Sequence, residues 1–324
     1  MTTTTFTLDQ LTLDAAAETA RITGAIRRQL RQLKRKGVVV GLSGGIDSSV
    51  TAALSVEALG ADRVLGLLMP ERDGSSESRR LGEMLAERYG IPWTVENIAP
   101  TLEALGCYRK RDEALGRVFP DFQSDWRWKI VLPSLFGDVP YRIFEAVAVD
   151  PEGNEHRRRM PLDVYQEVVA ATNFKQRVRK MLEFYHADRL RYAVAGTPNR
   201  LEHDQGFFVK NGDGSADIKP IAHLLKGQVY QLAEHLDVPE EIRRRPPTTD
   251  TYSLEQTQEE FFFSLPYEQM DACLWGRDRG VPETRIATAT GLSLEQVERV
   301  YADIDAKRRA AEYLHARPLM VETV

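Results

Sequence analysis

Hydrophobic residues recur at helical spacing over residues 12–36, near the N-terminus of the chain. The apolar positions are Leu13, Ala16, Ile22, Ile26, Leu30 and Leu33, and arginines and lysines gather in the last turns. After Gly37, residues 38–42 form an unbroken apolar run, Val-Val-Val-Gly-Leu. A short run without polar alternation is typical of a strand that is buried on both faces. The pattern therefore predicts a helix followed by a buried strand of a parallel sheet.

Strand-like and helical segments continue to alternate along the chain. We predict further strands at residues 64–69, 93–98 and 191–196, and further helices at residues 49–59, 79–89, 165–186 and 223–236. Strands that alternate with helices form βαβ units, in which the strands are parallel and the helices cover the sheet. We therefore predict an α/β fold with a doubly wound parallel sheet. Its two halves are residues 1–98 and 165–250, and residues 251–324 form a helical C-terminal region.

Residues 99–164 break this alternation and are predicted to be an insertion. Residues 141–149 have the composition of a strand, Asp150-Pro-Glu-Gly153 is a turn signal, and residues 156–160 provide a partner strand. The insertion is thus expected to contain a hairpin. Two roles are open for it: a surface elaboration or dimer contact, or a lid that reshapes the pocket for an acid substrate.

The composition narrows the class of protein. Of the 324 residues, 42% are hydrophobic, which is enough for one large α/β domain with an insertion. The formal net charge of −5 argues against a protein whose main partner is nucleic acid. Cys107 and Cys273 lack the spacing of metal ligands, and no apolar run reaches the length of a membrane helix. Because the N-terminus has no apolar leader, we expect a cytoplasmic protein.

The residues with the clearest chemistry follow the first predicted strand: Ser43-Gly44-Gly45-Ile46-Asp47-Ser48. Glycines let a backbone approach an anion closely, and the amides at the start of the next helix favour phosphate. Ser43 and Ser48 can donate hydrogen bonds to phosphate oxygens, and Asp47 can hold Mg²⁺. The bland alternative is an ordinary tight turn. The lysine of a Walker A loop is absent, which suits pyrophosphate as the leaving group better than transfer of the terminal phosphoryl group.

This loop resembles the Ser-Gly-Gly-x-Asp-Ser signature of the N-type ATP pyrophosphatases, and three further motifs resemble those of the NAD synthetase family among them. The motifs are Asn173-Phe-Lys-Gln-Arg177-Val-Arg179, Gly196-Thr197-Pro-Asn199-Arg-Leu-Glu202 and the block at residues 206–221. They are similar to the family's Asn-x-x-x-Arg-x-Arg, Gly-Thr-x-Asn-x-x-Glu and Gly-Phe/Tyr-Phe-Thr-Lys-x-Gly-Asp-Gly segments. The resemblance covers residues 20–98 and 165–275 and implies the adenine nucleotide alpha hydrolase-like fold.

The resemblance also implies roles for particular residues. ATP would be contacted by Gly41, Ser43, Gly44, Gly45, Asp47, Ser48, Thr197, Lys226 and Thr248. Mg²⁺ would be held by Asp47 and Glu202, and the substrate deamido-NAD by Arg177, Lys210, Asp217 and Lys307. Catalysis would rest on Asp47 and Lys210.

Physical reasoning supports some of these roles and leaves others open. Arg177 and Arg179 diverge by ~200° on a helix, so they do not serve the same anion. Thr197 and Glu202 follow the fourth predicted strand, at the carboxyl edge where open α/β sheets bind ligands. Taken alone, Glu202 could be a solvated loop carboxylate, Arg177 part of a surface ion pair, and Lys210 a solvent-facing side chain.

The sequence therefore predicts an ATP-dependent amide ligase that uses Mg²⁺, adenylates a carboxylate and passes it to ammonia. The resemblance implies NAD synthetase activity, in which deamido-NAD, ATP and ammonia give NAD, AMP and pyrophosphate. The alternatives are a related ligase that acts on another carboxylic acid, a tRNA-modifying ATP pyrophosphatase, and a non-catalytic nucleotide sensor. Neither cysteine lies in a glutaminase-like context, so ammonia is expected to be free or supplied by a separate glutaminase. The resemblance also implies a homodimer.

Overall fold

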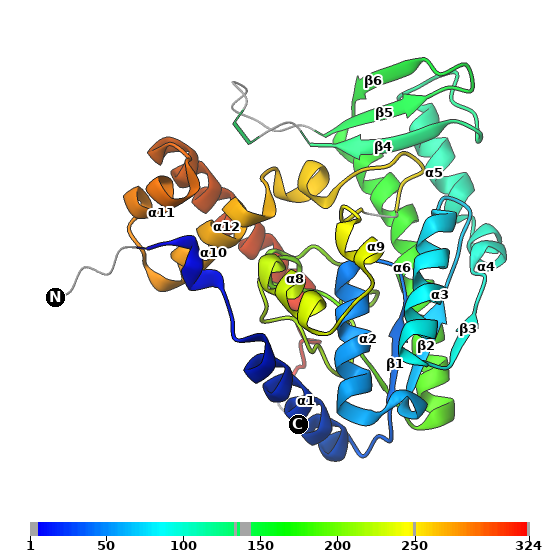
Figure 1. Cartoon of the computed structure of the whole chain (residues 1–324). Helices are drawn as coiled ribbons and strands as arrows, with labels where there is room; N and C mark the ends of the chain where they lie inside the picture. Colours follow the sequence, from blue (N-terminus) through cyan, green and yellow to red (C-terminus); the bar gives the residue numbers. More distant parts are fainter. Residues whose placement is uncertain (1–5, 133–134, 137–143, 249–250, 323–324) are drawn as a thin grey trace.

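A parallel sheet of four strands forms the centre of the molecule (Figure 1). The computed structural model describes residues 6–132, 135–136, 144–248 and 251–322. The strands run in the order β3 (Trp93–Val95), β2 (Val64–Leu68), β1 (Val38–Gly41) and β7 (Ala193–Val194), and each neighbouring pair is parallel. The doubly wound parallel sheet predicted from the sequence is therefore confirmed.

Helices cover both faces of this sheet, which explains why the start of β1 is apolar at successive positions. One face is covered by α1 (Ala15–Leu33), α2 (Ile46–Leu59), α3 (Ser76–Tyr89) and α8 (Lys226–His235), and the other by α6 (Leu162–Leu190). Val38 and Val40 belong to the first core, whereas Val39 packs with Ala187 of α6. All three valines are fully buried. The apolar run is thus a strand between two helical layers.

The fourth predicted strand is shorter than expected. After α6 the chain turns at Arg191, which has a φ of +57°, and it pairs with β1 only at Ala193 and Val194. The amide of Ala195 still donates to the carbonyl of Val39 at 2.9 Å, but Ala195 forms its own parallel bridge with Ile218. The chain therefore leaves β1 early, and the residues that follow β7 are placed at the carboxyl edge of the sheet.

Residues 99–164 contain a separate small sheet that stands on α6 (Figure 1). After α4 (Ala99–Ala104) and α5 (Cys107–Gly116), the antiparallel strands β4 (Arg127–Val131), β5 (Glu145–Val149) and β6 (Glu155–Arg159) pair in that order. The predicted hairpin is confirmed as β5 and β6, and residues 141–143 of its first strand lie outside the described part of the chain. The pattern did not predict α4, α5 or β4. Trp128 and Ala148 share a core with Leu115 of α5 and Val164 of α6.

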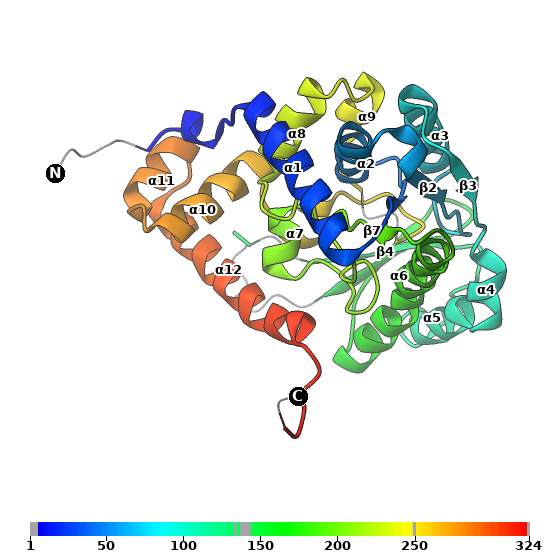
Figure 2. The ribbon, with the colours of Figure 1, turned by 90° about the horizontal axis from the view of Figure 1, so that it is seen from below.

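The C-terminal region is helical, as predicted, and forms a second core beside the sheet (Figure 2). The remaining elements are α7 (Arg200–Gln205), α9 (Glu240–Arg244), a π-helical turn (Glu259–Phe263), α10 (Tyr267–Arg279), α11 (Glu283–Thr290), α12 (Leu294–His315) and two short 3-10 helices (Leu8–Leu11 and Ala61–Arg63). Cys273, Ile286 and Val300 are fully buried where α10, α11 and α12 meet. In the described part of the chain, no helix is long and apolar enough to cross a bilayer.

The connection between β1 and α2 packs tightly against α3. Gly44 has a φ of +72°, which lies in the left-handed region. A Cβ atom on Gly44 would lie 2.5 Å from the carbonyl oxygen of Ser78 and 2.9 Å from the Cβ of Leu81. Both atoms belong to α3, so rotation of a flexible side chain cannot relieve the contact. Glycine is therefore required here for its conformation and for its size.

Replacement of Gly44 by alanine should destabilise the protein more than the same change at Gly90, which is the matched control. Both glycines have positive φ values, but nothing lies within 4 Å of a Cβ on Gly90. The backbone cost of about 1 kcal/mol is common to both, whereas the clash in Gly44→Ala adds roughly 1–3 kcal/mol. Urea denaturation of the two variants measures this difference. Equal losses of unfolding free energy would contradict the packing argument.

Candidate active site

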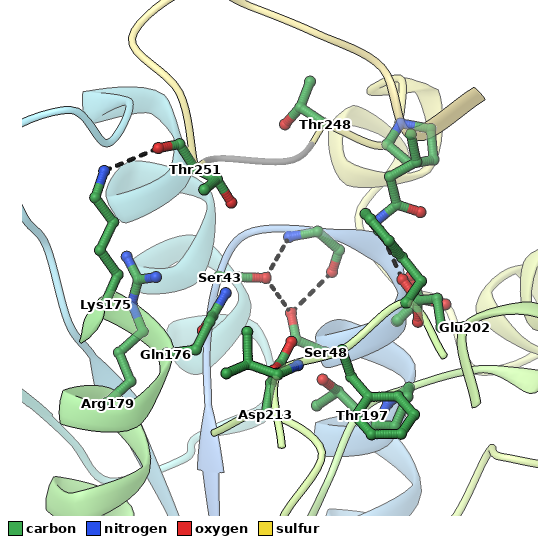
Figure 3. Close-up of a pocket in the computed structure, with 18 of the residues that line it drawn as sticks. Ser43, Ser48, Lys175, Gln176, Arg179, Thr197, Glu202, Asp213, Thr248 and Thr251 are labelled. Carbon is green, nitrogen blue, oxygen red and sulfur yellow. Dashed lines mark hydrogen bonds between the residues drawn. The ribbon is translucent and has the colours of Figure 1, made fainter. Parts of the chain in front are cut away.

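The loop that joins β1 to α2 is closed by its own side chains (Figure 3). The hydroxyl oxygens of Ser43 and Ser48 lie 3.0 Å apart, and Ser48 donates to the carbonyl of Gly45 at 3.0 Å. The amide of Gly45 donates to Ser43 Oγ at 3.3 Å. Because α2 begins at Ile46, its first amides have no partner inside the helix and are available to a ligand. The loop is thus formed in advance for an anion.

A cavity of about 780 Å³ opens over this loop, at the carboxyl edge of the sheet. Its polar lining residues include Ser43, Asp47, Ser48, Lys175, Gln176, Arg179, Thr197, Glu202, Asp213, Thr248 and Lys307. The inserted segment contributes Leu132 and Phe144 to the same cavity. The carboxyl edge is where open α/β sheets bind their ligands, so this cavity is the candidate active site.

A buried group of charged and amide side chains adjoins the loop. Lys226, whose side chain is fully buried, donates to Asp47 Oδ2 at 2.5 Å, and Asn199 Nδ2 donates to Asp47 Oδ1 at 3.1 Å. Glu202 accepts hydrogen bonds from the backbone amide of Asn199 at 3.0 Å and from Gln258 Nε2 at 3.1 Å. Because these residues come from four different segments, the group joins α2, α7 and α8 to the chain before the π-helical turn.

Burial and the neighbouring charges shift the pKa values of Glu202 and Lys226 in this group. Burial and the neighbouring carboxylate of Asp47 raise the pKa of Glu202 to about 8, and Lys226 opposes them only in part. For Lys226, burial acts to lower the pKa, but the attraction of Asp47 and Glu202 outweighs it and the pKa is raised. At neutral pH the ammonium is therefore charged, and Glu202 is held as the neutral acid.

Most of the predicted ATP contacts lie together in the cavity. Its lining includes Gly41, Ser43, Gly45, Asp47, Ser48, Thr197 and Thr248. Lys226 reaches the loop through Asp47, whereas Gly44 lies behind the loop against α3. Of the predicted metal and substrate residues, Glu202 and Lys307 also line the cavity. Lys307 Nζ donates to the carbonyl of Phe262 at 2.6 Å.

Three predicted substrate residues are not part of the cavity lining. Arg177 is exposed, and its Nε lies 3.4 Å from the carbonyl oxygen of Lys210. Lys210 Nζ donates to the carbonyl of Tyr313 at 2.8 Å. Asp217 accepts a hydrogen bond from the backbone amide of Val194 at 2.8 Å. Arg177 and Lys210 are thus next to each other, but the structure does not bring them together with residues 43–48.

Sequence reasoning missed residues that hold the site in place. Asn199 caps α7 and also fixes Asp47, and its place inside the Gly-Thr-x-Asn-x-x-Glu motif was the available signal. Lys175 is buried and donates to two carboxylates and to the carbonyl of Thr251 at 2.8 Å. It lies inside the Asn-x-x-x-Arg-x-Arg motif, at a position that the motif leaves open. Gln258 carried no sequence signal.

Comparisons with known proteins agree on one family. The NAD synthase family model matches residues 18–119 and 144–311. The NH(3)-dependent NAD(+) synthetase of Rhizobium meliloti is 57% identical over 319 residues, which are 98% of this chain and 96% of that protein. The enzyme of the same name from Thermotoga maritima is 34% identical over 250 residues, 77% of this chain and 83% of the relative.

Solved structures show the same fold at lower identity. A structure of NMN synthetase from Francisella tularensis superimposes with a TM-score of 0.66 at 22% identity, and the match covers 96% of this chain and 100% of the other chain. An NH3-dependent NAD synthetase from Campylobacter jejuni gives a TM-score of 0.63 at 19% identity, with the same coverage. The adenine nucleotide alpha hydrolase-like fold and the family motifs agree with these matches, and we conclude that the chain belongs to the NAD synthase family.

Proposed function

We propose that this chain is an ammonia-dependent NAD synthetase, which converts deamido-NAD, ATP and ammonia into NAD, AMP and pyrophosphate. The observation that carries the proposal is that the 43–48 loop, with its helix amides, lines one cavity together with Glu202, while the buried ammonium of Lys226 binds Asp47 of that loop. Such a site can bind a phosphate chain and stabilise pyrophosphate as it leaves. The relative that is 57% identical over nearly the whole chain supports this choice of reaction.

A magnesium ion fits the charge balance of the site. Mg²⁺ usually takes one or two carboxylates from a protein and completes its shell with phosphate oxygens and water. Among the residues that the structure describes, no three His, Cys, Asp or Glu side chains are grouped as metal ligands. Burial is the main cause of the raised pKa of Glu202 and the carboxylate of Asp47 adds to it, so a cation bound here would favour the ionised form of Glu202. Asp47 and Glu202 would hold Mg²⁺, which when bound neutralises phosphate charge.

The residues of the chain position the reactants for two displacements. The loop amides and the hydroxyls of Ser43 and Ser48 bind the two terminal phosphates, and Thr197 and Thr248 line the path of the nucleotide. The carboxylate oxygen of the acid attacks the α-phosphorus, and the bond to the β-phosphate oxygen breaks to release pyrophosphate. Ammonia then attacks the carbonyl carbon of the adenylate, the bond to the phosphate oxygen breaks, and AMP leaves as ammonia loses a proton. Positioning and charge neutralisation supply the catalysis.

We assign the part of deamido-NAD that lies outside the cavity to the outer side of α6, where Arg177 and Lys210 lie next to each other. Met181 and Tyr185 follow Arg177 at intervals of four residues and are 58% and 59% exposed, so one helix face carries a cation and two large apolar side chains. We infer that a second copy of the chain covers this face in a homodimer. Lys210 Nζ donates to the carbonyl of Tyr313 and has two further protons with which it can bind the substrate.

The ammonia is either free or delivered by a separate glutaminase. In the described residues both cysteines are buried thiols, and burial raises the pKa of Cys107 to about 11 and of Cys273 to about 12. Neither is suited to the thiolate chemistry of glutamine hydrolysis. Free thiols are also typical of a reducing compartment, which supports the cytoplasm as the place of the reaction.

Purified protein should form NAD, AMP and pyrophosphate in equal amounts when it is given deamido-NAD, ATP, MgCl₂ and ammonium. Asp47→Asn should lower kcat/KM at least about 100-fold, because it removes a charge that the metal and Lys226 both need. Nicotinic acid mononucleotide and unmodified tRNA serve as competing substrates. If pyrophosphate is released with one of these but not with deamido-NAD, the substrate assignment is wrong and the assignment of an ATP pyrophosphatase reaction stands. Release of ADP and orthophosphate would overturn both.

The stability of the ligand-free protein should fall as the pH rises from 6 to 8. The folded pKa of Glu202, about 8, lies above its ordinary value of 4.5, so the folded state holds a proton that the unfolded state has released. The stabilisation from this bound proton is complete at low pH and is lost as the pH rises towards about 8. Glu202 then lowers the free energy of unfolding by at most about 1.4 kcal/mol per pH unit. Saturating Mg²⁺ with ATP should reduce the fall.

Glu202→Gln is the control for this pH dependence. Asp271, whose pKa burial raises to about 7, contributes in the same direction in both proteins. The difference between wild type and Glu202→Gln in urea denaturation at each pH therefore isolates Glu202. If the free energy of unfolding of the two proteins changes with pH in parallel, Glu202 is ionised in the folded state, and the argument for a magnesium site at Asp47 and Glu202 fails.

A further inference from the structure

One side of α6 faces the cavity with polar side chains that have no partner among the described residues. Asn173, Gln176 and Arg179 follow one another at intervals of three residues and line the cavity. Figure 3 draws Gln176 and Arg179 on α6, on the side of the cavity that faces Ser43. Within the described part of the chain, these three side chains form no hydrogen bond or ion pair. Groups of this kind in a cavity are available to a ligand.

Arg179 differs from the other cations of the cavity. Lys175 contacts Glu71 and Asp73, Lys180 contacts Glu183, Lys307 contacts Asp303, Arg79 contacts Glu83, and Arg245 donates to the hydroxyl of Ser78. Among the residues that the structure describes, the guanidinium of Arg179 therefore adds a positive charge to the cavity wall that no ion pair compensates. In a concave site such a charge attracts an anion.

The level of Arg179 along α6 indicates which anion it meets. Glu183 Oε1 lies 3.2 Å from the Cβ position of Gly41, the last residue of β1. Because α6 leads into a strand that is parallel to β1, its earlier residues lie beyond the carboxyl edge of the sheet. Four residues of helix rise about 6 Å. Arg179 thus stands one turn beyond the edge, on the same side of it as residues 43–48.

A buried ionic cluster keeps nearby carboxylates away from Arg179. Lys175 Nζ lies 3.0 Å from Glu71 Oε1 and 2.8 Å from Asp73 Oδ2, and Arg111 Nη1 lies 2.5 Å from the same oxygen of Asp73. The side chains of Lys175, Glu71, Asp73 and Arg111 are each less than a tenth exposed. Both acids of the loop after β2 are therefore neutralised within this cluster, and neither of them pairs with Arg179.

We propose that Arg179 binds the α-phosphate of ATP and of the acyl-adenylate. The inference rests on the proposed function, in which residues 43–48 and Asp47 serve the two phosphates that leave. Arg179 lines the cavity from α6, on the wall that faces Ser43, so it is available to the phosphate that remains, where charge accumulates as the carboxylate attacks. A guanidinium can bind two phosphate oxygens with fixed geometry. Gln176, one turn away, can add a neutral hydrogen bond.

Binding of nucleotides without any acid substrate tests this assignment. Isothermal titration with ATP, AMP and pyrophosphate, each with MgCl₂, should show that Arg179→Gln weakens ATP and AMP at least about tenfold. Pyrophosphate affinity should stay within about twofold, and Arg179→Lys should recover part of the AMP affinity. Arg189→Gln is the matched control, because Arg189 lies exposed at the far end of α6, outside the cavity lining. Unchanged AMP affinity in Arg179→Gln would overturn the proposal.

Steady-state kinetics with deamido-NAD provide the second measurement. Loss of a charge that acts in the transition state should lower kcat about 100-fold and leave the KM for deamido-NAD within about threefold. A large rise in that KM with normal AMP affinity would instead assign Arg179 to the carboxylate of the acid. If the protein makes no NAD at all, the proposed function fails, but the AMP titrations still decide the role of Arg179. Equal thermal midpoints for Arg179→Gln, Arg179→Lys and wild type separate these results from misfolding.

Discussion

The buried ion pair between Lys226 and Asp47 is the interaction on which the site depends. Lys226 is the first residue of α8, where the helix dipole opposes a positive charge, and its side chain is fully buried. Asp47 offsets the cost of burying the ammonium, while Asp271 accepts the amides of Lys226 and Gly227 at 3.1 and 2.7 Å. Loss of one partner of a buried pair typically costs about 3–5 kcal/mol. The pair therefore fixes α8 against α2, and with α2 the loop at residues 43–48.

The sequence predicted the parts of the site that are local and could not predict the partners. The 43–48 loop is specified by glycine conformation and by the helix that follows, so a short motif suffices to identify it. Lys226 and Asp47 are 179 positions apart, and only the folded sheet brings them together. Asn199 shows the same limit, because a helix cap can be predicted from its sequence but a second bond to Asp47 cannot.

The faces of α6 illustrate what periodicity decides and what it leaves open. Helical geometry separates Arg177 from Arg179, and the structure agrees, since Arg177 is exposed and Arg179 lines the cavity. Which of the two faces inward depends on how α6 packs on β1, and this packing is not local information. The strand β4 was missed for a related reason: within its five residues Trp128, Ile130 and Val131 are buried, which is neither strict alternation nor a continuous run.

The small sheet of the insertion is connected to the site through the chain that follows α9. The backbone amide of Trp128 in β4 donates to Ser253 Oγ at 2.9 Å, and the backbone carbonyl of Trp128 accepts the amide of Leu254 at 3.1 Å. Gln256 Nε2 donates to the carbonyl of Ile130 at 2.7 Å. Two residues later Gln258 donates to Glu202. A strand outside the central sheet thus positions the side chain that donates to Glu202, so β4 supports the cavity as well as β1 does.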